Sequence, residues 1–126
     1  MSKARILVVD DDEGIRQSLS LILKKRGYLA EACACGKDAV TKLRSSPYDV
    51  LLTDLRMPEM GGIELLKAAR KLYPSMGAII MTGFGEISTY LEAMDLGAAE
   101  YINKPVKSEE LELIIKKLMA KQKIDA

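Results

Sequence analysis

The sequence predicts a doubly wound α/β fold, in which helices cover both faces of a five-stranded parallel sheet. Five short runs of aliphatic residues alternate with five longer stretches whose apolar residues recur at helical spacing. The short runs are apolar almost throughout, which is typical of strands buried on both faces of a parallel sheet. The chain has 126 residues, 48% of them hydrophobic, so we expect one domain over residues 1–126 with its core over about 4–120.

Two strand–helix units are expected in the first third of the chain. "RILVV" (5–9) predicts a buried strand, and the amphipathic stretch after it predicts a helix that Gly27 ends. "LAEAC" (29–33) predicts a second, weaker strand, and residues 36–45 predict a second helix. The residues expected to face the core from these helices are Ile15, Leu19, Ile22, Leu23, Ala39, Val40 and Leu43.

The third and fourth units follow the same pattern. "DVLLT" (49–53) predicts a strand, and "GGIELLKAARKLYP" predicts a helix that Pro74 ends. "GAIIMT" (77–82) predicts the fourth strand, and residues 86–96 predict a helix that Gly97 closes. The residues expected to share one side of that helix are Ile87, Leu91 and Met94.

The fifth unit completes the sheet. "AEYIN" (99–103) predicts the last strand, and Ser108 is the expected N-cap of the last helix, with Glu109 and Glu110 in its first turn. The apolar stripe of this helix consists of Leu111, Ile114, Ile115, Leu118 and Met119. Residues 121–126, "KQKIDA", are expected to be a frayed tail or the start of a linker.

The expected topology brings several strand ends together. Because strand–helix–strand crossovers are right-handed, few topologies remain for five such units. We expect the flavodoxin-like strand order 2-1-3-4-5, with five helices on the two faces of the sheet. In such sheets the functional crevice lies outside the carboxyl ends of the strands. The first, third, fourth and fifth strands are contiguous in this order, so the residues that follow them are expected to meet.

Polar side chains stand at the ends of those four strands. They are Asp10, Asp11 and Asp12 after the first, Asp54 and Thr82 at the ends of the third and fourth, and Lys104 after the fifth. Three of these carboxylates, two after the first strand and one at the end of the third, make a hard oxygen site that suits Mg²⁺. Asp54 could then act as a nucleophile toward phosphorus. The metal and Lys104 would neutralise charge on the phosphoryl oxygens, and the Thr82 hydroxyl would add a hydrogen bond.

Each of these residues also has an ordinary structural interpretation. Asp12 is the expected N-cap of the following helix, whereas Asp54 alone fits a loop residue. Thr82 alone fits a turn hydroxyl, and Lys104 alone fits a solvated charge. Their coincidence at adjacent strand ends is what favours a shared site.

Composition excludes several other chemistries. The chain has no His, which excludes His-ligated metal sites and Ser-His or Cys-His catalysis. Lys plus Arg number 19 and Asp plus Glu 18, and the net charge of +1 gives no electrostatic case for binding nucleic acid or membranes. Cys33 and Cys35 are interpreted as small, semi-buried thiols. No run approaches the roughly 20 apolar residues of a membrane span and no signal peptide precedes the first strand, so a cytoplasmic protein is expected.

Four motifs, in order and spacing, resemble the receiver domains of two-component response regulators. They are "VVDDDEGIR", "VLLTDLRMPEMGGIELL", "IIMTG" and "GAAEYINKPV", and the resemblance covers residues 4 to about 120. It implies a signalling domain rather than an enzyme, one that catalyses only its own phosphorylation and dephosphorylation. The implied phosphodonor is a phosphohistidine on a sensor histidine kinase or a phosphotransfer protein.

The resemblance implies the phosphoacceptor and the metal ligands. Asp54 matches the aspartate that takes the phosphoryl group. Asp10 and Asp11 match the acidic pair that holds Mg²⁺, for which Mn²⁺ can substitute, Asp11 directly and Asp10 through water. Arg56 matches the position whose backbone carbonyl completes the metal site.

The resemblance also implies how the domain switches. Thr82 matches the hydroxyl residue that moves toward the phosphoryl group, and Lys104 matches the lysine that pairs with it. Tyr101 matches the aromatic switch residue, and the Lys104–Pro105 bond is expected to be cis. The surface of helix 86–96, strand 99–103 and the last helix would then shift, and an output protein or an output domain outside this chain would respond to it. Dimerisation through this surface is left open.

Two positions depart from the commonest receiver pattern. Gly83 stands where Ala is usual, which gives more room to Tyr101. Phe84 stands where many relatives carry a polar residue. In the family this position and that of Arg56 tune how water reaches the acyl phosphate. We therefore expect Phe84 and Arg56 to shield the phosphoryl group and to make the phosphorylated form long-lived.

Three other interpretations compete with this one. Asp10-x-Asp12 after an apolar strand is similar to the start of haloacid-dehalogenase phosphatases, but Glu13-Gly14 replaces the usual hydroxyl residue. A calcium loop of the EF-hand type fits less well, because Gly14 is at the fifth position from Asp10 rather than the sixth. The third alternative is a receiver that works only as a phosphorylation-independent interaction module.

Overall fold

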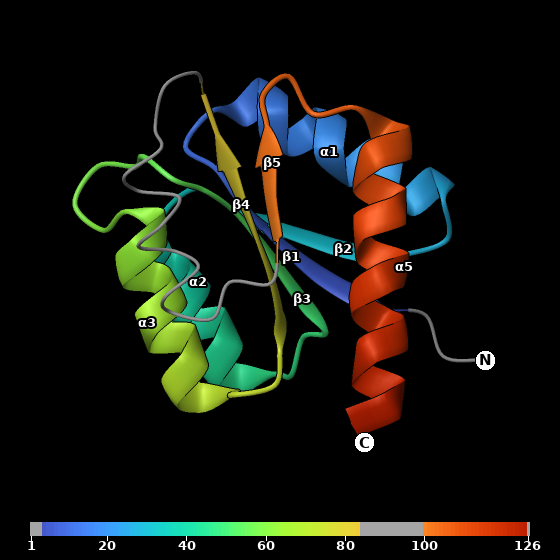
Figure 1. Cartoon of the computed structure of the whole chain (residues 1–126). Helices are drawn as coiled ribbons and strands as arrows, with labels where there is room; N and C mark the ends of the chain where they lie inside the picture. The colour runs from blue at the N-terminus through green and yellow to red at the C-terminus, as the bar shows by residue number, and fades with distance from the viewer. Residues whose placement is uncertain (1–3, 84–99, 126) are drawn as a thin grey trace.

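The computed structural model describes residues 4–83 and 100–125, with side chains as far as residue 122. Within these ranges it contains five strands and four helices (Figure 1). They are β1 (Arg5–Val9), α1 (Glu13–Lys25), β2 (Leu29–Cys33), α2 (Gly36–Ser45), β3 (Val50–Asp54), α3 (Gly62–Leu72), β4 (Gly77–Thr82), β5 (Glu100–Asn103) and α5 (Ser108–Asp125). The helix predicted over residues 86–96 lies outside the described residues.

The sheet has the predicted topology. All neighbouring strands are parallel, and their order is β2-β1-β3-β4-β5. The register pairs Asp54 with Met81 and Thr82 with Asn103, so the carboxyl ends of β3, β4 and β5 lie at one edge. The predicted flavodoxin-like fold is therefore confirmed.

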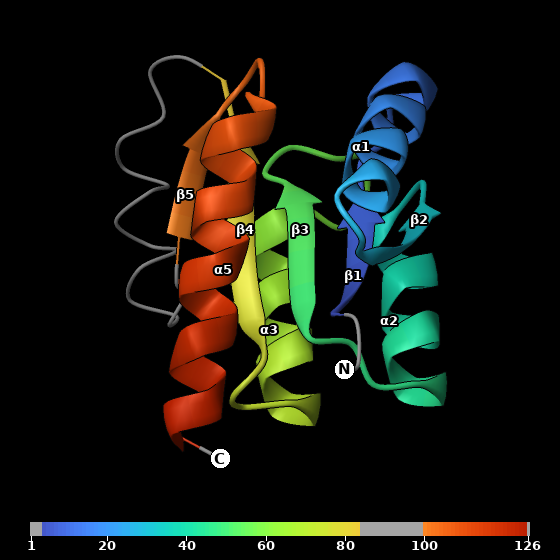
Figure 2. The same cartoon turned by 90° about the vertical axis from the view of Figure 1, so that its right-hand side faces the viewer.

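Helices cover both faces of the sheet because successive strand residues point to opposite sides. In β1, Ile6 and Val8 pack in one cluster with residues of α1 and α5, whereas Leu7 and Val9 pack in another with residues of α2 and α3. Figures 1 and 2 show the same three layers, with the sheet between the two pairs of helices. Each of these four residues is fully buried, which explains why β1 is apolar without interruption.

Two local predictions about α1 are confirmed. Asp12 is the N-cap, and its Oδ1 accepts a hydrogen bond of 3.0 Å from the backbone N–H of Ile15. Gly27 follows the helix with φ of +92°, a left-handed conformation that favours glycine.

The last helix differs from the prediction at both ends. Ser108 is its first residue rather than its N-cap, since the N–H of Leu111 donates to the carbonyl of Lys107. The Ser108 hydroxyl instead accepts from Nη2 of Arg26 at 3.3 Å. The segment from residue 121, predicted as a frayed tail or linker, is helical as far as Asp125. The Gln122 amide donates to the Asp49 carbonyl at 2.8 Å, which ties this end to the sheet.

No helix in the two described ranges is both long and apolar enough to cross a bilayer.

Candidate functional site

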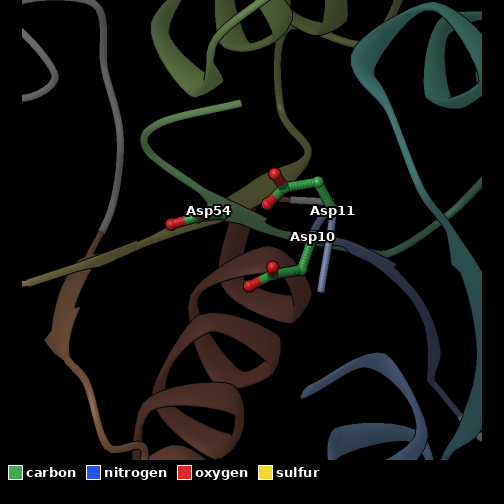
Figure 3. Close-up of side chains that lie close together, drawn as sticks. All are labelled: Asp10, Asp11 and Asp54. Carbon is green, nitrogen blue, oxygen red and sulfur yellow. The ribbon is translucent and has the colours of Figure 1, made fainter. Parts of the chain in front are cut away.

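Three carboxylates lie together at the carboxyl edge of the sheet. Asp10 and Asp11 follow β1 directly, and Asp54 is the last residue of β3. One oxygen of each lies within 4.8 Å of the others, and Figure 3 shows the three side chains close together. Asp10 is fully buried and Asp54 is only 8% exposed, whereas Asp11 is exposed. The cluster is therefore built into the fold on one side and open to solvent at Asp11.

Local hydrogen bonds fix the position of Asp10. Its Oδ1 accepts from the backbone N–H of Asp12 at 2.9 Å, and its backbone N–H donates to the carbonyl of Cys33 at 3.3 Å. Arg16 donates from Nη1 to the Asp10 carbonyl at 2.9 Å. Arg16 was not among the site residues predicted from the sequence. The available signal was a cation early in α1, where the helix dipole disfavours positive charge.

Lys104 bridges the two buried carboxylates. Its Nζ lies 3.0 Å from Oδ2 of Asp10 and 3.1 Å from Oδ1 of Asp54. The loop after β5 places it there, since the backbone N–H of Lys104 donates to the carbonyl of Thr82 at 2.8 Å. The Lys104–Pro105 peptide bond is cis. Burial lowers the pKa of the ammonium, but the hydrogen bonds to Asp10 and Asp54 outweigh it and raise the pKa.

Asp54 is the carboxylate most affected by its surroundings. Burial raises the pKa of its carboxyl, and the negative charge of Asp10 acts in the same direction. The hydrogen bond from Lys104 opposes both effects, but the pKa remains above its ordinary value. An added cation would therefore stabilise the ionised form.

Lys104→Ala is expected to destabilise the metal-free protein, because it leaves two buried carboxylates facing each other without their cation. The free energy of unfolding should fall by about 1–3 kcal/mol in EDTA at pH 7. Urea unfolding followed by circular dichroism measures the loss. Lys71→Ala, at an exposed position in the last turn of α3, removes the same charge and should have little effect. Equal losses in the two variants would contradict the compensating role of Lys104.

The other predicted site residues lie at or near the same edge. Thr82 is the last residue of β4 and is 1% exposed, and its hydroxyl donates to the Gly83 carbonyl at 3.1 Å. Tyr101 is half-buried in β5, where it packs against the cluster of Leu55, Leu66, Ala78 and Ile80. Arg56 is exposed, two residues after Asp54. Phe84 lies outside the described residues.

The donor set fits a divalent hard cation. Among Asp10, Asp11, Asp54 and Lys104, three carboxylates face one ammonium, so two negative charges remain uncompensated. Carboxylate oxygens are ligands that Mg²⁺ prefers, and the ion usually keeps several bound waters. The site is open to solvent at Asp11, so it leaves room for such waters. Among the described residues, the carboxylate cluster consists of Asp10, Asp11 and Asp54 and does not include Asp12. The Asp12 carboxylate instead caps α1.

The fold and the acidic cluster define a flavodoxin-like α/β domain whose carboxyl edge can hold a divalent cation. Comparison with protein families matches residues 6–116 to the response regulator receiver domain. The chain belongs to this family and is thus a signalling domain of the two-component type.

Individual relatives agree with this assignment. The chain is 37% identical over 117 residues to the DNA-binding transcriptional regulator NtrC of Proteus hauseri, covering 93% of this chain and 25% of that protein. It is 37% identical over 118 residues to the transcriptional regulatory protein ZraR of Salmonella typhimurium, covering 94% and 27%. The chain thus spans about a quarter of the length of these curated relatives.

A solved structure has almost the same fold over its whole length. It is a CheY-like response regulator receiver domain protein from Methanospirillum hungatei, with a TM-score of 0.95 and 35% identity. The alignment covers 99% of this chain and 100% of that one.

Proposed function

We propose that this domain is switched by phosphorylation of Asp54. The donor is a phosphohistidine on a sensor histidine kinase or a phosphotransfer protein, because the chain has no His of its own. The observation that carries the proposal is Lys104, whose ammonium lies 3.1 Å from the Asp54 carboxylate at the open acidic cluster.

The residues of the cluster have distinct roles in this reaction. A carboxylate oxygen of Asp54 attacks phosphorus, the O–P bond forms, and the N–P bond to the donor imidazole breaks with its electron pair returning to nitrogen. Asp10, Asp11, Asp54 and the backbone carbonyl of Arg56 are the proposed ligands of Mg²⁺. When bound, the ion neutralises charge on the phosphoryl oxygens.

Lys104 and Thr82 link phosphorylation to the rest of the domain. Lys104 already contacts Asp54, and it stays in reach of a phosphoryl group attached there. The Thr82 hydroxyl, now directed at the Gly83 carbonyl, turns toward the phosphoryl oxygens. That movement frees space for Tyr101 on the neighbouring strand, and the surface formed with residues 86–96 and α5 changes.

The output partner binds the surface that changes on phosphorylation. It is a separate protein or a further domain; the similar NtrC is a DNA-binding transcriptional regulator of which this chain covers 25%. The chain's net charge of +1 gives no electrostatic case for direct binding of nucleic acid.

Uptake of a phosphoryl group tests the proposal. The protein, incubated with acetyl phosphate and Mg²⁺, should gain one phosphoryl group per chain and no second one in intact-mass spectra, and EDTA should prevent the gain. A phosphorylation-independent interaction module would take up none. A haloacid-dehalogenase-like phosphatase would instead hydrolyse p-nitrophenyl phosphate over many turnovers.

The lifetime of the phosphorylated form is a further part of the proposal. Phe84 and Arg56 are proposed to limit the access of water to the acyl phosphate. Phe84→Ala should therefore shorten the lifetime severalfold, measured as decay of the phosphorylated mass after the donor is removed. Phe84→Leu, which keeps apolar bulk, should decay more like the wild type. Rapid decay of the wild type that Phe84→Ala leaves unchanged would contradict this role.

A further inference from the structure

Gly62, the first residue of α3, lies directly against the backbone of the acceptor residue. It is buried, and a Cβ added to it would lie 2.4 Å from the Asp54 carbonyl oxygen and 3.0 Å from the Leu55 Cα. These distances are far inside normal contact. Both obstructing atoms belong to the backbone, so no side chain can rotate away to make room.

The Asp54–Leu55 peptide cannot easily move away either. The N–H of Leu55 donates to the carbonyl of Met81 at 3.0 Å, and the carbonyl of Asp54 accepts from the Thr53 hydroxyl at 3.0 Å. The N–H of Gly62 donates to the Leu55 carbonyl at 2.9 Å. The Leu55 carbonyl belongs to the next peptide, so bonds to β4 and β3 hold the Asp54–Leu55 peptide itself and α3 holds the peptide that follows it. A displacement would break at least one of these bonds.

This contact is unlike those of the other glycines in the described ranges. A Cβ at Gly36 would meet the side chain of Met60 at 2.7 Å, and one at Gly77 would meet the side chain of Leu118 at 3.2 Å. Those neighbours are flexible side chains, and a Cβ at Gly61 would come no closer than 3.2 Å to the Leu55 carbonyl oxygen. Of the described glycines, Gly62 is the one whose added Cβ would come closer than 3.0 Å to backbone.

We propose that Gly62 is a positioning residue for the acceptor and the cation. Its missing side chain lets α3 begin against the Asp54 carbonyl, which sets where β3 ends and where the following carbonyls lie. The Asp54 carboxylate and the Arg56 carbonyl, both proposed metal ligands, lie on this short segment. The inference rests on the proposed function for its consequence in phosphoryl transfer, but its effect on the cation site is independent of that transfer.

Gly62→Ala is expected to weaken Mg²⁺ binding at least about 10-fold, the effect typical of changes just outside a metal's ligands. Titration calorimetry with Mg²⁺ alone, well below the unfolding temperature, measures the affinity of the folded protein. Gly77→Ala adds the same methyl group at a buried position at the other end of β4 and should leave the affinity unchanged. Unchanged affinity in Gly62→Ala would overturn the inference, because a merely structural glycine would alter stability only.

A second readout needs no metal. Amide hydrogen exchange of the Leu55 N–H in EDTA should accelerate in Gly62→Ala, relative to amides in the centre of β1, if the peptide is displaced. Equal protection in the variant and the wild type would overturn the inference.

Thr53→Val is the substitute variant if Gly62→Ala does not fold, because it tests the position of the same Asp54–Leu55 peptide. It removes the hydroxyl that holds the Asp54 carbonyl while keeping the side-chain shape, and it should weaken Mg²⁺ binding roughly threefold. Unchanged Mg²⁺ affinity in Thr53→Val would contradict the claim that the position of the Asp54–Leu55 peptide controls cation binding. Phosphoryl uptake separates the two proposals: no uptake by the wild type refutes the proposed function, whereas normal uptake with unaltered metal binding in the variants refutes the role of Gly62 alone.

Discussion

Asp54→Asn should abolish phosphoryl uptake, lowering its rate by roughly 100-fold or more, because an amide oxygen or nitrogen is a poor nucleophile toward phosphorus. The side chain keeps its shape, so the fold and the neighbouring strands should be retained. The measurement is the initial rate of mass increase with acetyl phosphate and Mg²⁺. Uptake by the variant to one phosphoryl group per chain would refute the assignment of Asp54.

Stability provides the control for this variant. A carboxyl whose pKa is raised on folding contributes stability below its unfolded pKa of about 3.9, and this contribution is lost as the pH rises through the folded pKa. Ionised Asp54 therefore lowers the stability of the metal-free folded state. Asp54→Asn should be at least as stable as the wild type in EDTA by thermal unfolding. A strongly destabilised variant would mean that lost uptake reports unfolding instead.

Asp11→Asn should remove most of the response to Mg²⁺. For the wild type, Mg²⁺ at about ten times its dissociation constant should stabilise the folded state by about 1.4 kcal/mol, a shift of roughly 5 °C in Tm. The variant loses a charged oxygen ligand, so this shift should largely disappear, and phosphoryl uptake should fall by about 10- to 100-fold. Thermal unfolding across a Mg²⁺ series and the mass-based uptake rate are the two measurements.

Asp12→Asn is the matched control for that experiment. It removes the same charge one residue away, and Asn replaces Asp well as an N-cap, so α1 should be preserved. Its Mg²⁺-induced shift in Tm should stay close to that of the wild type. If Asp12→Asn lost the shift as fully as Asp11→Asn, the ion would be held differently from the proposed way.

Much of the site was predictable because parallel strands end at one edge. Crossover handedness leaves few strand orders, and the predicted order among them brings Asp54 and Lys104 together although they are far apart in sequence. The cap at Asp12 and the end of α1 at Gly27 depend on neighbouring residues alone, and both were predicted correctly.

The features that were missed depend on contacts between distant segments. Ser108 has the local pattern of an N-cap, but Arg26 engages its hydroxyl and the helix begins at Ser108 itself. The final turns of α5 look frayed locally, yet Gln122 reaches the carbonyl of Asp49. Gly62 lies in the stretch predicted as the third helix, and the need for a glycine there appears only where α3 meets the Asp54 carbonyl.

Mapping the phosphorylated residue tests the proposed function most directly. The wild-type protein is treated with acetyl phosphate and Mg²⁺, the acyl phosphate is trapped by borohydride reduction, and the digested peptides are identified by mass spectrometry. The modification is expected only on the peptide that contains Asp54, and it should be absent when EDTA replaces Mg²⁺. A modification at Asp10, Asp11 or another residue, or no modification in protein shown to be folded, would contradict Asp54 as the phosphoacceptor.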